Sequence, residues 1–331
     1  MKGNRKAQIG LVAAFVLVVG VAMASGLTSK GARSKATPVT VLLDWTLNPA
    51  HSGLLTAIDA HTDTDAGVAV KLQTPPASSD GTRLLLSGRA DLAVMDIHDL
   101  AIARERGRDL IAVMTVIGKP LASLIASPAI KRPRDLEGKT VAISGAPSDI
   151  AVTRSIVAAD GGDPNKVRIQ QAGYAATEAL VGGRADAATG FFNEEGVALA
   201  AKNRGFHTFR LDSYGAPAYP ELLLVTTKKK IAEARETIKA TVGALAEGSR
   251  LAVSDPAATL AMLENKLPGA DQKLLKARTD ASLGAMLPPN RRAGSLDPEL
   301  MREWGIWEAA QHIVKQEPDT VRMMTIRFTL H

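Results

Sequence analysis

A four-residue pattern occurs once in each half of the chain and constrains the fold more than any other feature. Gly88-Arg89-Ala90-Asp91 leads into the apolar run Leu92–Met95, and Gly183-Arg184-Ala185-Asp186 leads into Ala187–Thr189. In each copy a glycine ends a helix-like stretch and an apolar run follows, as expected for a buried strand of a parallel sheet. The repetition predicts two similar α/β lobes, although four residues are too few to establish a duplication.

Candidate binding residues lie near the start of the chain, between the apolar run 39–43, which predicts a strand, and a helix-like segment at 50–60. They are Asp44, Trp45, Asn48 and His51. They fall at the carboxyl end of the predicted strand, where α/β proteins bind ligands. Trp45 offers a stacking face, Asn48 can donate and accept hydrogen bonds, and His51 lies near unpaired N–H groups of a first helical turn. The alternative is a loop in which the Trp packs under the helix and Asn48-Pro49 is an ordinary helix start.

Two further strand ends carry candidates. Asp96 and His98 follow the run 92–95, and we expect them on the same sheet edge as Trp45. Gly145 and Ser148 lie in a turn from a strand into a helix, whose free N–H groups would favour an anion or the polar edge of a ligand. The alternative for this turn is a plain helix cap.

Aromatic and acidic residues follow the second copy of the repeat, and the candidates among them are Phe191, Asn193 and Glu194. In a binding site, the carboxylate would accept a hydrogen bond from a ring amino group while the aromatic side chain stacks on the ring. The alternative is a solvated helix start, because Glu is favoured in a first helical turn.

The motif Asp44-Trp45-x-x-Asn48-x-x-His51-x-Gly53 resembles the opening motif of the NMT1/THI5-like family. Its members are substrate-binding proteins of ABC importers for thiamine-precursor pyrimidines, with relatives for sulfonates, nitrate and riboflavin. The resemblance implies that Phe191–Glu195 corresponds to an aromatic-Asn-aromatic-Glu-like segment of the pyrimidine-binding relatives, and leaves open which ring and which acid take part. It also implies that residues 214–225 form the return crossover between lobes, with Tyr219 among the site candidates.

The same resemblance implies a two-lobed periplasmic-binding-protein fold of type II. Each lobe would be a mixed sheet flanked by helices, with the ligand in the cleft between lobes. The expected division is 38–127 for the first part of lobe one, 128–220 for lobe two, and 221–331 for a return to lobe one with C-terminal helices. The crossovers would act as hinges, which sit at the ends of such elements.

The first 24 residues have the features of a cleaved signal peptide. A basic start precedes the apolar run Ile9–Val21, and Ala22-Met23-Ala24 is an A-x-A cleavage signal. An uncleaved N-terminal anchor is the alternative, and residues 25–37 are expected to form a flexible leader. We therefore expect an exported protein, located in the periplasm or at the cell surface.

Composition excludes several classes of function. The chain contains no Cys, so thiolate metal sites, Cys nucleophiles and disulfides are excluded. The net charge of +6 comes from scattered basic residues, which gives no sign of a nucleic-acid face. The spacing of His and carboxylate residues suggests no metal, and no cofactor motif is present, so we expect neither a metal nor a cofactor.

These observations and the resemblance together predict an exported, monomeric solute-binding protein that works with a membrane permease and an ATPase. The first expected ligand is formylaminopyrimidine or hydroxymethylpyrimidine, and riboflavin comes next. A sulfonate or nitrate is less favoured because Glu194 and Glu195 would repel it. One alternative is a pyrimidine-synthase-like enzyme that recruits His51, although such enzymes use a Cys-rich motif that this chain lacks. Another is a ligand sensor for a membrane receptor.

Overall fold

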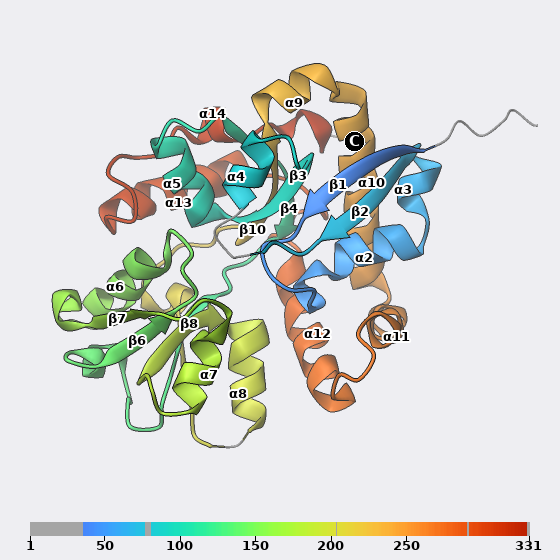
Figure 1. The fold of residues 1–331 in the computed structure, drawn as a ribbon. Coiled ribbons are helices and arrows are strands. Elements are labelled where there is room, and N and C mark those ends of the chain that lie inside the picture. The colour runs from blue at the N-terminus through green and yellow to red at the C-terminus, as the bar shows by residue number, and fades with distance from the viewer. Residues whose placement is uncertain (1–35, 77–80, 203, 290, 330–331) are drawn as a thin grey trace, which may run out of the picture. The chain divides into compact units, whose positions relative to one another are not determined.

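The computed structural model describes residues 36–76, 81–202, 204–289 and 291–329 (Figure 1). The expected signal peptide, and the expected leader up to residue 35, lie outside these described residues. Within them, no helix combines the length and the apolar character that crossing a membrane requires.

The first of two five-stranded sheets has the strand order β2-β1-β3-β10-β4. Its strands are β1 (Thr37–Leu42), β2 (Val68–Gln73), β3 (Leu92–Asp96), β4 (Leu110–Ile117) and β10 (Leu222–Thr227). β1 runs parallel to β2 and β3, whereas β10 is antiparallel to β3 and β4. The sheet is therefore mixed, as expected for each lobe.

The second sheet repeats this arrangement with the order β7-β6-β8-β5-β9. Its strands are β5 (Ala122–Ala126), β6 (Thr140–Ile143), β7 (Arg168–Gln171), β8 (Ala187–Phe191) and β9 (His207–Arg210). β6 runs parallel to β7 and β8, whereas β5 is antiparallel to β8 and β9. In both sheets an antiparallel strand therefore occupies the fourth position, and the α/β fold class with two mixed sheets is confirmed.

The passage from the first sheet to the second comes earlier than the sequence suggested. The expected boundary at residue 127 placed the run 121–126 in lobe one, but β5 pairs with β8 and β9 of the second sheet. The chain therefore leaves the first sheet between Ile117 and Ala122. β5 is buried along its whole length, so its apolar sequence predicts a strand but does not identify the sheet that it joins.

The repeated Gly-Arg-Ala-Asp pattern has the same structural role in both sheets. Asp91 Oδ2 accepts a hydrogen bond of 2.8 Å from the backbone N–H of Thr40, at β1. Asp186 Oδ2 accepts one of 2.8 Å from the N–H of Thr140, at the start of β6. In both copies the backbone N–H of the same Asp donates back to the carbonyl of that Thr. The two residues therefore fasten equivalent strands, which explains why the pattern occurs twice.

Helices flank both sheets (Figure 1). They are α2 (Ser52–Asp59), α3 (Thr62–Asp65), α4 (Gly81–Leu86), α5 (Ile97–Glu105), α6 (Asp149–Ala159), α7 (Ala176–Val181), α8 (Val197–Ala201), α9 (Lys228–Glu233), α10 (Arg235–Ser254), α11 (Pro256–Lys266), α12 (Gln272–Met286), α13 (Pro298–Ala310) and α14 (Thr320–Met323). Residues 228–254 form two helices, α9 and α10, that meet at Ala234, whose backbone is non-helical.

The core of the first sheet lies on both of its faces. Val41 of β1, Leu54 of α2 and Leu245 of α10 belong to one buried apolar cluster. Trp304 of α13 is fully buried and belongs to another. Helices cover both faces of the sheet, so the site forms at the ends of its strands.

Candidate functional site

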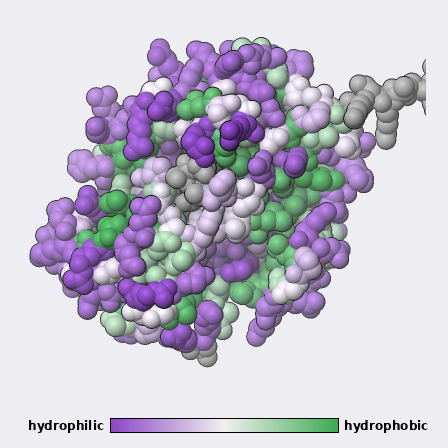
Figure 2. Space-filling view, in the orientation of Figure 1, coloured by the Kyte–Doolittle hydropathy of each residue, from purple (hydrophilic) through white to green (hydrophobic). Residues whose placement is uncertain are grey.

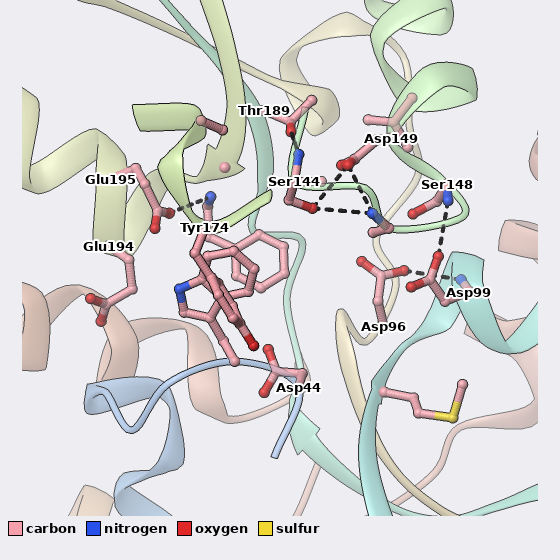
Figure 3. Close-up of a pocket in the computed structure, with 18 of the residues that line it drawn as sticks. Asp44, Asp96, Asp99, Ser144, Ser148, Asp149, Tyr174, Thr189, Glu194 and Glu195 are labelled. Carbon is pink, nitrogen blue, oxygen red and sulfur yellow. Dashed lines mark hydrogen bonds between the residues drawn. The ribbon is translucent and has the colours of Figure 1, made fainter. Parts of the chain in front are cut away.

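A cavity is lined by segments that follow the parallel strands of both sheets (Figure 3). The residues after β1 and β3 form one part of the lining, and those after β6 and β8 form another. This is the strand edge at which α/β proteins bind ligands. Seven of the twelve predicted site residues line the cavity, namely Asp44, Trp45, Asn48, Asp96, Ser148, Phe191 and Glu194.

The lining is strongly acidic. Among its described residues none carries a basic side chain, and six carry a carboxyl group: Asp44, Asp96, Asp99, Asp149, Glu194 and Glu195. Carboxylates attract positive charge and accept hydrogen bonds, and they repel anions. The cavity therefore favours a ligand that is rich in N–H donors or positively charged.

Asp44 is held in place by a buried histidine. The backbone N–H of Asn48 donates to His51 Nδ1 over 3.2 Å, so Nδ1 is the accepting nitrogen of the ring. Nε2 then carries the proton and donates to Asp44 Oδ1 over 2.7 Å. His51 is fully buried and lies outside the lining, so it orients Asp44 from behind. Asn48 lines the cavity and also caps the turn Pro49–His51, since its Oδ1 accepts from the N–H of Ala50.

A π-helical turn, η6 (Phe192–Gly196), presents two further acids to the cavity (Figure 3). Glu194 is buried, and its Oε2 lies 3.2 Å from Arg278 Nε on α12. Its Oε1 has no hydrogen-bond partner among the described residues. Burial, only partly offset by Arg278, raises the pKa of Glu194 to about 8. The Oε2 of Glu195 accepts from the N–H of Phe191, so one oxygen of each Glu is engaged by the protein.

Asp96 and Asp99 lie on the side of the cavity away from Glu194 and Glu195 (Figure 3). Asp96 caps α5, because its Oδ1 accepts from the N–H groups of His98 and Asp99 over 2.7 and 3.3 Å. Asp99 Oδ1 accepts from the N–H of Ser148 over 3.0 Å, which joins a helix of the first sheet to a turn of the second. Burial and the nearby Asp96 carboxyl raise the pKa of Asp99 to about 8.

Backbone N–H groups of the turn between β6 and α6 already have hydrogen-bond acceptors within that turn. Asp149 Oδ2 accepts from Ser144 Oγ over 2.9 Å and from the N–H groups of Gly145 and Ala146 over 2.7 and 3.0 Å. Gly145, at φ +91°, does not line the cavity. The N–H groups that the sequence suggested for a ligand are therefore used within the protein, and the helix-cap alternative describes Gly145 correctly.

Aromatic side chains supply apolar surface between the two acidic sides. Trp45 meets Tyr174 edge-on, with ring centroids 4.3 Å apart and an angle of 73° between the planes. The hydroxyl of Tyr174 donates to the carbonyl of Pro75 over 3.1 Å. Phe191 also lines the cavity. A planar ring can stack or pack edge-on against such a group.

Three other predicted site residues are fully buried outside the lining: His98, Asn193 and Tyr219. His98 Nδ1 lies 2.6 Å from Glu308, and its Nε2 lies 3.2 Å from the Tyr219 hydroxyl. Burial opposes the charge on His98, but Glu308 and Asp96 outweigh it and raise the pKa of His98 to about 10. Asn193 Nδ2 donates to Ser282 Oγ over 2.9 Å. These side chains support the cavity from behind.

Sequence reasoning missed several lining residues, notably Asp99, Asp149 and Tyr174. An acid in the first turn of a helix is common for reasons of helix electrostatics, so the two Asp residues gave no separate signal. Tyr174 follows β7, a largely exposed edge strand. Its position after a strand, next to Gly173, was the available signal.

One group among the described residues has the composition of a cation site. Asp96, His98 and Glu221 each offer one ligating atom, and these atoms lie within 4.8 Å of one another. Only Asp96 among them lines the cavity.

Comparisons with known proteins agree with this architecture. The NMT1/THI5 like family model matches residues 48–259. The formylaminopyrimidine-binding protein of Halalkalibacterium halodurans is 29% identical over 285 residues, which are 84% of this chain and 86% of that protein. The 4-amino-5-hydroxymethyl-2-methylpyrimidine phosphate synthase of Legionella pneumophila is 26% identical over 163 residues, which are 49% of this chain and 51% of that protein.

Among solved structures, the periplasmic nitrate-binding protein NrtA from Synechocystis PCC 6803 matches with a TM-score of 0.69 and 10% identity, over 89% of this chain and 88% of that one. This likeness is one of fold, and it confirms the expected periplasmic-binding-protein fold of type II. The family model covers more than half of the residues, and the matched span includes Asn48 and Glu194 of the cavity lining. The chain therefore belongs to the NMT1/THI5-like family.

Proposed function

We propose that this protein is the exported binding component of an ABC importer and takes a thiamine pyrimidine precursor, formylaminopyrimidine or hydroxymethylpyrimidine. The observation that carries the proposal is Glu194, which lines a cavity whose described lining holds six acids and no basic side chain, and whose Oε1 has no hydrogen-bond partner among the described residues. An aminopyrimidine presents a ring nitrogen and an amino group side by side. The carboxyl group of Glu194 can pair with both at once if its proton passes to the ring nitrogen, so that the carboxylate accepts from two N–H donors.

The aromatic residues fit the same ligand. Trp45 and Phe191 line the cavity, and Trp45 is braced edge-on by Tyr174. A flat ring placed against them would have Glu194 and Asp44 at its polar edge. The name of the Halalkalibacterium halodurans relative, a formylaminopyrimidine-binding protein, supports the same class of ligand.

The acidic lining argues against the anionic ligands of other branches of the family. A sulfonate or nitrate would meet Glu194 and Glu195 with no basic partner among the described lining residues. Burying an anion without a positive partner is costly, and its charge would also oppose any ionisation of the nearby carboxyl groups. Riboflavin, which is neutral and planar, is the ligand to test next.

We propose that binding is completed by closure of two lobes, with the division at 38–127, 128–220 and 221–331 adjusted so that β5 moves with lobe two. Contacts between the two sheets support this proposal. Ser148 donates to Asp99, and Tyr174 donates to Pro75. Asn193 donates to Ser282 over 2.9 Å. These bonds would hold the closed form, and opening would break all of them together.

A pyrimidine synthase is a second candidate, and the match to the Legionella pneumophila enzyme is the observation that favours it. His51 would be its reactive side chain. Against it stand the burial of His51, whose ring nitrogens are engaged by Asp44 and Asn48, and the absence of Cys from the chain. Mass spectrometry of the protein and of its reaction products would detect a modified His51 and a hydroxymethylpyrimidine phosphate if the protein were such a synthase.

A thermal-shift screen of the purified protein tests the binding proposal. The compounds are hydroxymethylpyrimidine, formylaminopyrimidine, riboflavin, an alkanesulfonate and nitrate. A ligand at about 100 times its dissociation constant adds roughly 2.7 kcal/mol to stability. A shift with a pyrimidine supports the proposal. A shift with only the sulfonate or nitrate refutes it and keeps the importer class.

A further inference from the structure

A buried polar cluster lies behind one side of the cavity. Asp96 lines the cavity, and Glu221 and His98 lie behind it, with one ligating atom of each within 4.8 Å of the others. Glu221 and His98 are fully buried. This cluster is away from Glu194, which lies on the opposite side of the cavity from Asp96 in Figure 3.

Each member of the cluster has one of its polar atoms bound by the protein. Asp96 Oδ1 accepts from two N–H groups of α5. Glu221 Oε2 accepts from the N–H groups of Leu121 and Ala122, on the segment that leads into β5. His98 Nδ1 is paired with Glu308.

The second carboxyl oxygen of Glu221 is not hydrogen-bonded in this way. Glu221 Oε1 is buried and has no hydrogen-bond partner among the described residues. Its neighbours include the carboxyl group of Asp96 and the hydroxyl group of Tyr219. Two carboxylates cannot bond each other without a proton or a cation between them. The pKa of Asp96 is raised well above its usual value by burial, and the adjacent Glu221 adds to the rise.

The charges around this cluster do not balance. Three carboxyl groups, of Asp96, Glu221 and Glu308, surround the single cationic side chain, His98. Asp99 adds a fourth carboxyl group at the cavity surface. A positive group arriving through the cavity would meet Asp96 and Asp99 first, and would take the place of the proton that Asp96 otherwise needs beside the carboxyl group of Glu221.

We propose that the Asp96 side of the cavity is a subsite for a positively charged group on the ligand, so that the preferred ligand is an aminopyrimidine whose side arm ends in a free primary ammonium. This inference rests on the proposed function. The ring edge faces Glu194, and the ammonium on the five-position arm faces Asp96 and Asp99. A neutral formamide or hydroxymethyl arm fills the same space without supplying the charge.

A metal ion fits the cluster less well than an ammonium group. His98 is the one nitrogen ligand available, and both of its ring nitrogens are engaged, by Glu308 and by Tyr219. Glu221 is reached only past Asp96, which is the sole cluster member in the described lining.

Calorimetric titration with three pyrimidines tests the inference. All three carry the 4-amino-2-methylpyrimidine ring, and they differ at position five, which bears an aminomethyl, a hydroxymethyl or a formylaminomethyl group. The wild-type protein is expected to bind the aminomethyl compound about 10-fold or more tightly than the other two, the size of one charged hydrogen bond. This ranking needs no variant, so it cannot be obscured by misfolding.

Asp96→Asn assigns the preference to the subsite. Asn caps a helix as well as Asp does, so α5 is expected to keep its start while the charge is lost. The variant should lose most of the preference for the aminomethyl compound, measured as the ratio of its affinity to the affinity for the hydroxymethyl compound. Asp255→Asn makes the same change at the cap of α11, away from the cavity, and should keep the preference. Glu194→Gln should lower the affinity for all three compounds by a similar factor.

The outcomes separate the inference from the proposed function. If the hydroxymethyl or formyl compound binds as tightly as the amine, the cationic subsite is wrong and the proposed function stands. If none of the three binds, the proposed function fails as well. If Zn²⁺ alone raises the melting temperature and Asp96→Asn abolishes that rise, the cluster is a metal site and the inference is overturned.

Discussion

Replacing Glu194 by Gln is expected to strengthen the ligand-free protein while it weakens binding. Glu194 is buried, and its Oε1 lacks a partner among the described residues. Burial raises its pKa from 4.5 to about 8. A group whose pKa is raised on folding gives stability that is fully present below the unfolded pKa and is lost as the pH rises through the folded pKa. The acid therefore destabilises the fold increasingly from about pH 4.5 to pH 8.

The magnitude follows from the size of the shift. At pH 7 the unfolded Glu is ionised and the folded one is held protonated, which costs about 3 kcal/mol, at 1.36 kcal/mol for each pH unit above 4.5. Gln avoids this cost but gives up the 3.2 Å contact between the neutral carboxyl group and Arg278 Nε, worth up to about 1 kcal/mol. The variant should therefore gain about 2 kcal/mol at pH 7, and the gain should vanish near pH 4.

Urea unfolding of wild-type and Glu194→Gln protein between pH 4 and pH 8.5 measures this difference in the free energy of unfolding. Glu178→Gln, an exposed change on α7 outside the cavity, is the matched control and should leave stability unchanged. Affinity for an aminopyrimidine should fall about 10- to 100-fold in Glu194→Gln only. If that variant is less stable than wild type at pH 7, Glu194 is a structural partner of Arg278, and the reasoning is refuted.

Three other predictions follow from the site and the fold. Trp45→Ala should weaken pyrimidine binding by about 1–3 kcal/mol, because it removes a stacking surface, and isothermal titration measures the loss. Asp186→Ala should cost about 1–3 kcal/mol of stability, because it leaves the Thr140 N–H without its partner, and a urea melt that matches wild type would contradict this role. The ligand-free protein should lose stability as the pH rises from about 6.5 to 10. Burial lowers the pKa of His98, but Glu308 and Asp96 outweigh burial and raise it to about 10. Denaturation at constant ionic strength measures this loss, and a stability that does not change over this pH range would contradict the prediction.

The sequence predicted the parts of the fold that depend on local patterns. The Gly-Arg-Ala-Asp repeat indicated two similar α/β units, and Asp91 and Asp186 perform the same task in the two sheets. The positions of Asp44 and Glu194 after apolar runs indicated a strand edge, and both residues line the cavity. These inferences succeed because strand ends and helix starts are local features.

Pairing and burial over long distances could not be read in the same way. The apolar sequence of β5 would suit either sheet, so it does not show which one the strand joins. The predicted boundary at residue 127 therefore lies one strand too late along the chain. His98 and Tyr219 occur at plausible strand ends, but Glu308 of α13 holds His98 inside the protein. Asp99 lines the cavity and accepts a hydrogen bond from the N–H of Ser148, in a turn that follows a strand of the other sheet. This contact exists only in the folded chain.

The claim that the acidic cavity holds a pyrimidine is tested most directly by calorimetric titration of the purified protein with 4-amino-5-hydroxymethyl-2-methylpyrimidine. We expect saturable binding of one molecule per chain, strongly weakened in Glu194→Gln and retained in Glu178→Gln. Binding that survives Glu194→Gln unchanged, or no binding of any pyrimidine alongside clear binding of a sulfonate, would contradict the account.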